Sequence, residues 1–187
     1  MRFAIDDTAC SRAKNAHELY IINVLAFHLL LAPAAIALDI GLYALLLSPA
    51  ISLLVIGFIA LRSRWLRQHG EWFVMIHWRL ALRRALLLLA AYGASGAILL
   101  LVWLLTSSME GHSRDMMLTV FTRIAIMPTF IMLLITFVLE MSSLGQAGRG
   151  EVPDRLLARW PAPDDMTPLA EPDGEDSAGG APDEAPK

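Results

Sequence analysis

Two histidines and one arginine are candidates for chemistry, because they lie in or beside long apolar stretches. His28 lies about a third of the way into the apolar run that begins at Leu19, and a polar group at that depth needs a partner. His28 and His77 together suit the axial ligands of haem b, and Arg123, inside a later apolar segment, suits a quinone carbonyl. The alternatives are a hydrogen-bonded packing histidine and an arginine whose head group reaches back to the membrane surface.

His28 and Asp39 offer a second kind of chemistry. They are eleven residues apart, about three helical turns, so a continuous helix places both on one face. Two such groups would be stations on a proton or ion path. If the chain turns at Asp39 this path fails, and Asp39 becomes a carboxylate at the outer surface.

A third candidate gathers soft metal ligands on one short stretch. Thioether sulfur and imidazole nitrogen together select Cu(I). Methionine is also common in ordinary packing, which is the alternative reading of this stretch. The residues concerned are Met109, His112, Met116 and Met117.

The chain has no motif of known catalytic mechanism. It lacks a phosphate loop, G-x-G-x-x-G, H-E-x-x-H and a nucleophile elbow. Cys10 is the one cysteine, so no internal disulfide or Cys-x-x-Cys pair can form. The basic residues flank apolar segments, which indicates contact with a membrane surface and not with nucleic acid. We therefore expect no enzyme activity and no nucleic-acid partner.

The candidate residues must be positioned by apolar helices. The composition is 56% hydrophobic, against about 45–50% in soluble domains, and the apolar residues are grouped in blocks. A membrane span needs about 20 apolar residues. The sequence therefore predicts an all-α integral membrane protein with a four-helix membrane domain over 19–141. Its predicted spans are about 19–37, 41–61, 85–105 and 117–139.

Two break points compete in the first apolar run. A residue before proline avoids the helical region, which favours a break at Ser48–Pro49. Asp39 costs far less at an interface than in hydrocarbon, which favours a break near Asp39 and Gly41. We favour the second, with Pro33 and Pro49 as kinks.

Residues 62–84 form a basic loop with six arginines and three tryptophans. Basic residues mark the cytoplasmic side and tryptophan marks the interface, so both termini are expected in the cytoplasm of a bacterial inner membrane. Residues 71–82 predict an amphipathic interfacial helix. The expected lipid or partner contacts in this loop are Arg62, Arg64, Arg67, Arg79, Arg83 and Arg84.

Small residues recur in the third predicted span. Gly93-x-x-x-Ala97 has the spacing that lets two helix backbones approach closely, although glycine and alanine are common in spans generally. We expect Gly93 and Ala97 to contact another helix of the chain or a partner.

The two ends of the chain are polar. Residues 1–18 read as a short cytoplasmic arm. Residues 142–187 hold seven of the ten prolines and are strongly acidic, so a disordered tail is predicted. One exception is a short turn capped by Asp154.

Three classes of function follow. The first is a non-catalytic accessory, structural or assembly subunit of a multi-subunit inner-membrane complex, such as a bioenergetic one, bound to lipids and to other membrane subunits. The second is a membrane anchor of a redox complex that binds haem b or quinone. The third is a small ion or solute transporter, although no repeat between the two halves is visible.

Overall fold

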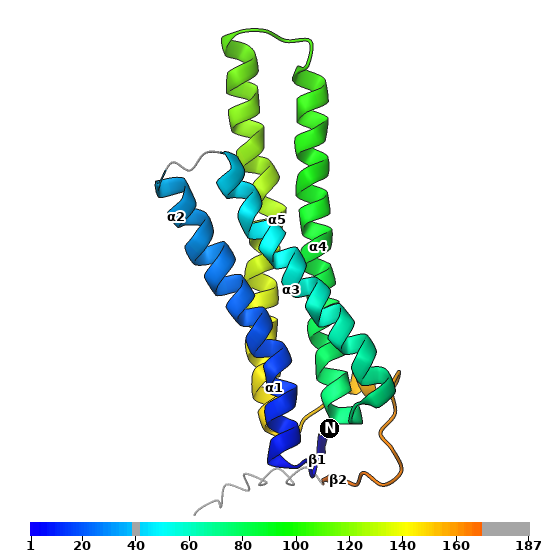
Figure 1. The fold of residues 1–187 in the computed structure, drawn as a ribbon. Coiled ribbons are helices and arrows are strands. Elements are labelled where there is room, and N and C mark those ends of the chain that lie inside the picture. The colour runs from blue at the N-terminus through cyan, green and yellow to red at the C-terminus, as the bar shows by residue number, and fades with distance from the viewer. Residues whose placement is uncertain (39–41, 170–187) are drawn as a thin grey trace, which may run out of the picture.

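The computed structural model describes residues 1–38 and 42–169 and is mostly helical, at 80%. The helices lie side by side in an elongated bundle (Figure 1). Three of them, Leu47–His69, Trp72–Thr106 and His112–Gly148, are long and apolar enough to cross a membrane, which confirms a helical membrane protein at this level. In chain order the elements are β1 (Arg2–Phe3), α1 (Asp7–Ile22), the π-helical segment η1 (Asn23–Leu31), α2 (Ala32–Ala37), α3 (Leu42–His69), α4 (Trp72–Thr106), α5 (His112–Gly148), α6 (Asp154–Leu157) and β2 (Pro168–Leu169).

Helices α4 and α5 form the longest hairpin and exceed what a bilayer requires (Figure 1). They have 35 and 37 residues. At a rise of about 1.5 Å per residue they are roughly 50–55 Å long, against a hydrocarbon core of about 30 Å. The apolar segments 85–105 and 117–139 lie inside these helices, so residues 72–84 of α4 and 140–148 of α5 extend beyond them at the end that carries β1 and β2.

The first apolar run folds as α1, η1 and α2, followed by α3. Helix α2 ends at Ala37 and α3 begins at Leu42, so the chain reverses between them. Asp39 and Gly41 lie outside the described residues. Pro49 lies inside α3, so the alternative break at Ser48–Pro49 does not occur.

The larger part of the buried core lies at one end of the bundle, which we call the head: residues 1–20, 62–84 and 140–169. Phe3, only 3% exposed, packs edge-on against Trp72 with ring centroids 5.3 Å apart. Along the rest of α4 and α5 many large apolar side chains are exposed, among them Leu100 and Ile131. A folded protein exposes apolar surface of this extent only where lipid or another protein covers it.

A separate interfacial helix at 71–82 is not found. Residues from Trp72 onward form the first turns of α4, and Phe73, Met75 and Ile76 are buried inside the head instead of facing acyl chains. An amphipathic pattern shows that one face is buried, but lipid and protein bury an apolar face equally well.

The prediction of a disordered tail is wrong for residues 142–169. Helix α5 continues to Gly148, and β2 pairs antiparallel with β1 in the register Arg2↔Leu169. The ammonium group of Met1 donates to the Val152 carbonyl and to Asp154 Oδ1, both at 3.1 Å. Composition misses this ordering because the two ends of the chain stabilise each other. Residues 170–187 lie outside the described part of the chain.

The short turn predicted near Asp154 is α6, although Asp154 is the first residue of the helix and Pro153 occupies the cap position. The N-terminal arm 1–18 is likewise folded, because it contributes β1 and most of α1 to the head.

Candidate functional site: a buried histidine–glutamate chain

Three titratable side chains meet inside the head, and each is fully buried. His17 comes from α1, His77 from α4 and Glu140 from α5, and all three are 0% exposed. His17 Nδ1 is hydrogen-bonded to Glu140 Oε2, and His17 Nε2 lies 2.9 Å from His77 Nδ1. His77 Nε2 lies 3.2 Å from the carbonyl oxygen of Glu151. The result is an unbroken chain from Glu140 to the backbone of the C-terminal segment.

Helical spacing explains why these side chains point inward. His17 lies on the face of α1 that also buries Ala13, four residues before it, and Tyr20, three residues after it. Glu140 lies on the face of α5 that buries Thr136 and, seven residues on, Ala147. The small alanines let the three helices approach closely, so that the polar groups reach one another.

The Glu151 carbonyl sets the protonation of the chain. A carbonyl only accepts hydrogen bonds, so His77 Nε2 carries a proton and donates it. The bond between the two imidazoles needs a second proton, and the bond between His17 and Glu140 needs a third. An ionised carboxylate with two neutral imidazoles supplies only two, so satisfying all three bonds requires one additional proton, shared along the chain.

Arg84 supplies a positive charge beside this chain. Its Nη1 donates to the Leu139 carbonyl at 2.6 Å and lies 3.6 Å from Glu140 Oε1. The Arg84 side chain is only 12% exposed, so this arginine, expected to contact lipid or a partner, is directed into the protein instead. Within the described residues Glu140 Oε1 accepts no hydrogen bond, and the ion pair with Arg84 is its polar contact.

His28 belongs to a second polar cluster, inside the apolar part of the bundle. Its Nε2 is hydrogen-bonded to Tyr92 Oη, and its Nδ1 lies 3.2 Å from the Asn23 carbonyl. Asn23 Nδ2 in turn donates to Ser52 Oγ at 2.9 Å. Two side chains also bond to carbonyls of the π-helical segment η1: His28 Nδ1 to that of Asn23, and Ser48 Oγ to that of Phe27.

Comparison with known proteins does not identify either cluster. No protein-family model matches this sequence, and searches of curated proteins and of solved structures find no match. The chemistry of the clusters must therefore follow from their own geometry.

The geometry does not favour a haem held between His28 and His77. The two histidines lie in different clusters, and both ring nitrogens of each already have a protein partner. An iron ligand needs a free ring nitrogen. Arg123 is exposed on the half of α5 that lies away from the head and from both clusters, which fits its reading as an arginine that reaches the membrane surface.

The two clusters are not joined into one path in the described part of the chain. His17 and His28 are eleven residues apart on the continuous run of α1 and η1, and the buried Val24 lies between them. No hydrogen bond bridges this gap among the described residues. The predicted path from His28 to Asp39 reaches a residue outside the described part.

The loop between α4 and α5 does not assemble a metal site from the acidic, histidine and cysteine side chains that the structure describes. Met109 lies in the turn between α4 and α5, and His112, Met116 and Met117 begin α5. His112 and Met116 are exposed.

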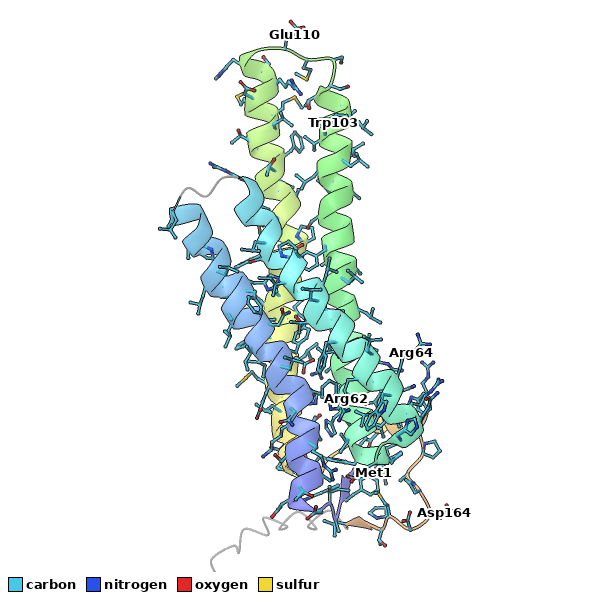
Figure 2. The ribbon with its side chains drawn as sticks, in the orientation of Figure 1. Met1, Arg62, Arg64, Trp103, Glu110 and Asp164 are labelled. Carbon is cyan, nitrogen blue, oxygen red and sulfur yellow. The ribbon has the colours of Figure 1, made fainter. Side chains whose placement is uncertain are left out.

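The residues expected to contact lipid or a partner differ in how exposed they are. Arg62, Arg64, Arg67 and Arg83 are exposed on the head, as Figure 2 shows for Arg62 and Arg64. Arg79 is partly covered, with its guanidinium 3.9 Å from the ring centre of Trp160. Gly93 and Ala97 are exposed, and a Cβ atom at Gly93 would meet no atom within 4 Å.

Sequence reasoning missed His17 and Glu140, the two ends of the buried ion pair. A signal for them existed: His17 directly precedes the first apolar run, and Glu140 ends the last one. With an even number of crossings these two positions lie at the same membrane surface. Charged groups at matching depths on neighbouring helices are candidates for pairing.

Proposed function

We propose that the protein is a non-catalytic accessory or assembly subunit of a multi-subunit complex in the bacterial inner membrane. In this proposal it crosses the membrane four times, with both ends in the cytoplasm. The observation that carries the proposal is a face of α4, made of small residues, that no other described part of the chain covers.

This face lies opposite the side of α4 that packs against the rest of the bundle. Leu88 is fully buried, and Ser95 Oγ lies 2.8 Å from Thr129 Oγ1 of α5. Ala97 is nine residues after Leu88, about 180° around the helix, and is exposed together with Ala90 and Gly93. Small residues allow close backbone contact between membrane helices, whereas lipid alone gives no reason to gather them on one face. A transmembrane helix of another subunit fits this face.

The four crossings rest on the first helical run and on the termini. Helices α1, η1 and α2 follow one another without a break from Asp7 to Ala37, and the apolar part of this run, 19–37, has 19 residues, about the length of one crossing. Both Met1 and Leu169 lie at the head (Figure 1), and two points of the chain at one surface require an even number of crossings between them. The arginines concentrate at this end, which is expected to be cytoplasmic by the positive-inside rule.

Site-specific photo-crosslinking in native membranes tests the proposal. A photoreactive amino acid is introduced at Ala97, and at Leu99 as a control that is also exposed, at 40%, but about 200° away around α4. We expect one defined partner protein, identified by mass spectrometry, from position 97 and not from position 99. Crosslinks only to lipid, or only to a second copy of this chain, would contradict the role of accessory subunit.

A second experiment uses affinity purification in mild detergent. The double substitution Gly93→Leu and Ala97→Leu places bulk on the small face without touching the core, because both positions are exposed. We expect the partner to be lost while the variant inserts and folds normally. Leu99→Ala is the matched control and should retain the partner.

A further inference from the structure

A pocket of about 190 Å³ opens in the head where α1, α3 and α4 meet. Its floor is apolar and includes the buried Leu66 and Val74, and the indole Nε1 of Trp78 donates to the Arg12 carbonyl at 3.4 Å. The pocket is therefore lined by three helices, of which α1 and α4 are joined by this hydrogen bond, and it belongs neither to the buried histidine–glutamate chain nor to the small face of α4.

The polar lining of the pocket is mainly basic. Arg12 and Arg62 both line it, together with Glu71 and His69. Arg12 Nη2 is already paired with Glu71 Oε1 at 2.6 Å. Among the described residues Arg62 has no ion pair, and its guanidinium lies over the Trp65 ring, 4.3 Å from the ring centre. Two guanidiniums against one carboxylate leave one positive charge at the pocket.

The position of the pocket along α3 indicates that it lies at the depth of the lipid head groups. Arg62 is the first charged residue after the apolar part of α3, and Trp65 follows within one turn. Tryptophan concentrates at the membrane–water interface, and arginines there lie within reach of lipid phosphates. Trp78, on the other side of the pocket, belongs to the part of α4 that precedes its apolar segment.

We propose that this pocket binds the phosphodiester head group of an anionic phospholipid. Arg62 would supply the guanidinium, whose flat array of donors matches phosphate oxygens. Trp65 holds that guanidinium in place, and the indole rings of Trp65 and Trp78 suit the glycerol region of the lipid. A zwitterionic head group brings its own cation to a pocket that is already positive, so the site should prefer an acidic lipid.

Native mass spectrometry of the full-length protein in detergent tests this proposal. The probes are dioleoylphosphatidylglycerol, dioleoylphosphatidylcholine and the soluble head-group ester glycerol 3-phosphate. We expect phosphatidylglycerol to bind more tightly than phosphatidylcholine, and Arg62→Gln to raise its Kd by about fivefold or more. Arg64→Gln is the matched control: Arg64 is exposed, about 200° away around α3, and does not line the pocket, so its effect should be below about twofold.

A gain-of-affinity variant completes the test. Glu71→Gln removes the carboxylate that neutralises Arg12, so it should tighten binding of phosphatidylglycerol. Equal losses for the Arg62 and Arg64 variants, or no preference over phosphatidylcholine, would reduce the site to diffuse surface charge and overturn the proposal. Tight binding of glycerol 3-phosphate that phosphatidylglycerol does not displace would identify a soluble phosphate ester as the ligand and overturn the lipid assignment.

Discussion

Replacing Glu140 with alanine should destabilise the protein strongly, whereas replacing it with glutamine should not. Alanine removes the partner of His17 Nδ1 and every polar atom of residue 140 that faces Arg84, where Glu140 and His17 are fully buried. Both substitutions remove the charge beside Arg84, but glutamine leaves an amide oxygen there, and Arg84 keeps its bond to the Leu139 carbonyl. Glutamine keeps the shape of the side chain, and its amide nitrogen can donate to His17 Nδ1. The remaining bonds, from His17 to His77 and from His77 to the Glu151 carbonyl, then stay as they are.

The size of the effect follows from this difference. Removing one partner of a buried ion pair costs about 3–5 kcal/mol, because the other charged or polar group stays buried without compensation. A chain of this length loses roughly 2–4 °C in Tm per kcal/mol, so Glu140→Ala should lower Tm by about 6–20 °C. For Glu140→Gln we expect a loss below about 1.5 kcal/mol, comparable to one hydrogen bond.

The assay is thermal unfolding of the purified protein in mild detergent, followed by circular dichroism. Glu110→Ala is the control, since Glu110 lies exposed in the loop at the far end of the bundle (Figure 2) and should change the free energy of unfolding by less than about 0.5 kcal/mol. If glutamine destabilises as much as alanine, the assignment of donors along the chain is wrong. If alanine is as stable as wild type, the buried chain does not hold the three helices together.

Three further predictions concern other parts of the molecule. Tyr92→Phe removes the hydroxyl that is hydrogen-bonded to His28 and should cost about 1–3 kcal/mol of unfolding free energy in the same assay. Tyr20→Phe should be close to neutral, because the Tyr20 hydroxyl is buried without a partner among the described residues. Phe3→Ala should cost about 3–5 kcal/mol and expose the head to limited proteolysis, and an unchanged digestion pattern would show that β1 is not essential to the head. Hydrogen bonds from Arg149 at 2.7 and 2.8 Å lower the pKa of Glu151. This pair therefore stabilises the fold above the ordinary Glu pKa, and its contribution is lost as pH falls through the lowered value. Arg149→Gln should return the Glu151 pKa to its ordinary range, which an NMR titration would measure.

Sequence patterns predicted three long apolar helices, because hydropathy is a property of each segment alone. The runs 85–105 and 117–139 lie inside α4 and α5, and the basic loop marks one end of the bundle. Helix lengths were less predictable. Residues 72–84 and 140–148 carry charges that suggest interfacial or disordered segments, yet they continue α4 and α5 because protein packing replaces lipid around them.

In the candidate site, too, local features were predictable from the sequence and long-range contacts were not. The depth of His28 in an apolar run predicted that it needs a partner, and Tyr92 and the Asn23 carbonyl provide one. No local pattern names Tyr92, since 64 residues separate the pair. His77 was singled out for haem, but its partners are His17 and the Glu151 backbone, which only the folding of both termini brings to it.

The sequence by itself determined that this protein is built from long apolar helices and that its arginines are concentrated at one end of them. Those properties depend on the transfer of each segment between water and hydrocarbon, which needs no knowledge of its neighbours. Only the tertiary structure decided that His17, His77 and Glu140 share one buried hydrogen-bonded chain, and that β1 and β2 pair at the same end of the bundle. Hydrogen bonds depend on the distance and angle between atoms far apart in sequence, and close packing of the helices sets both.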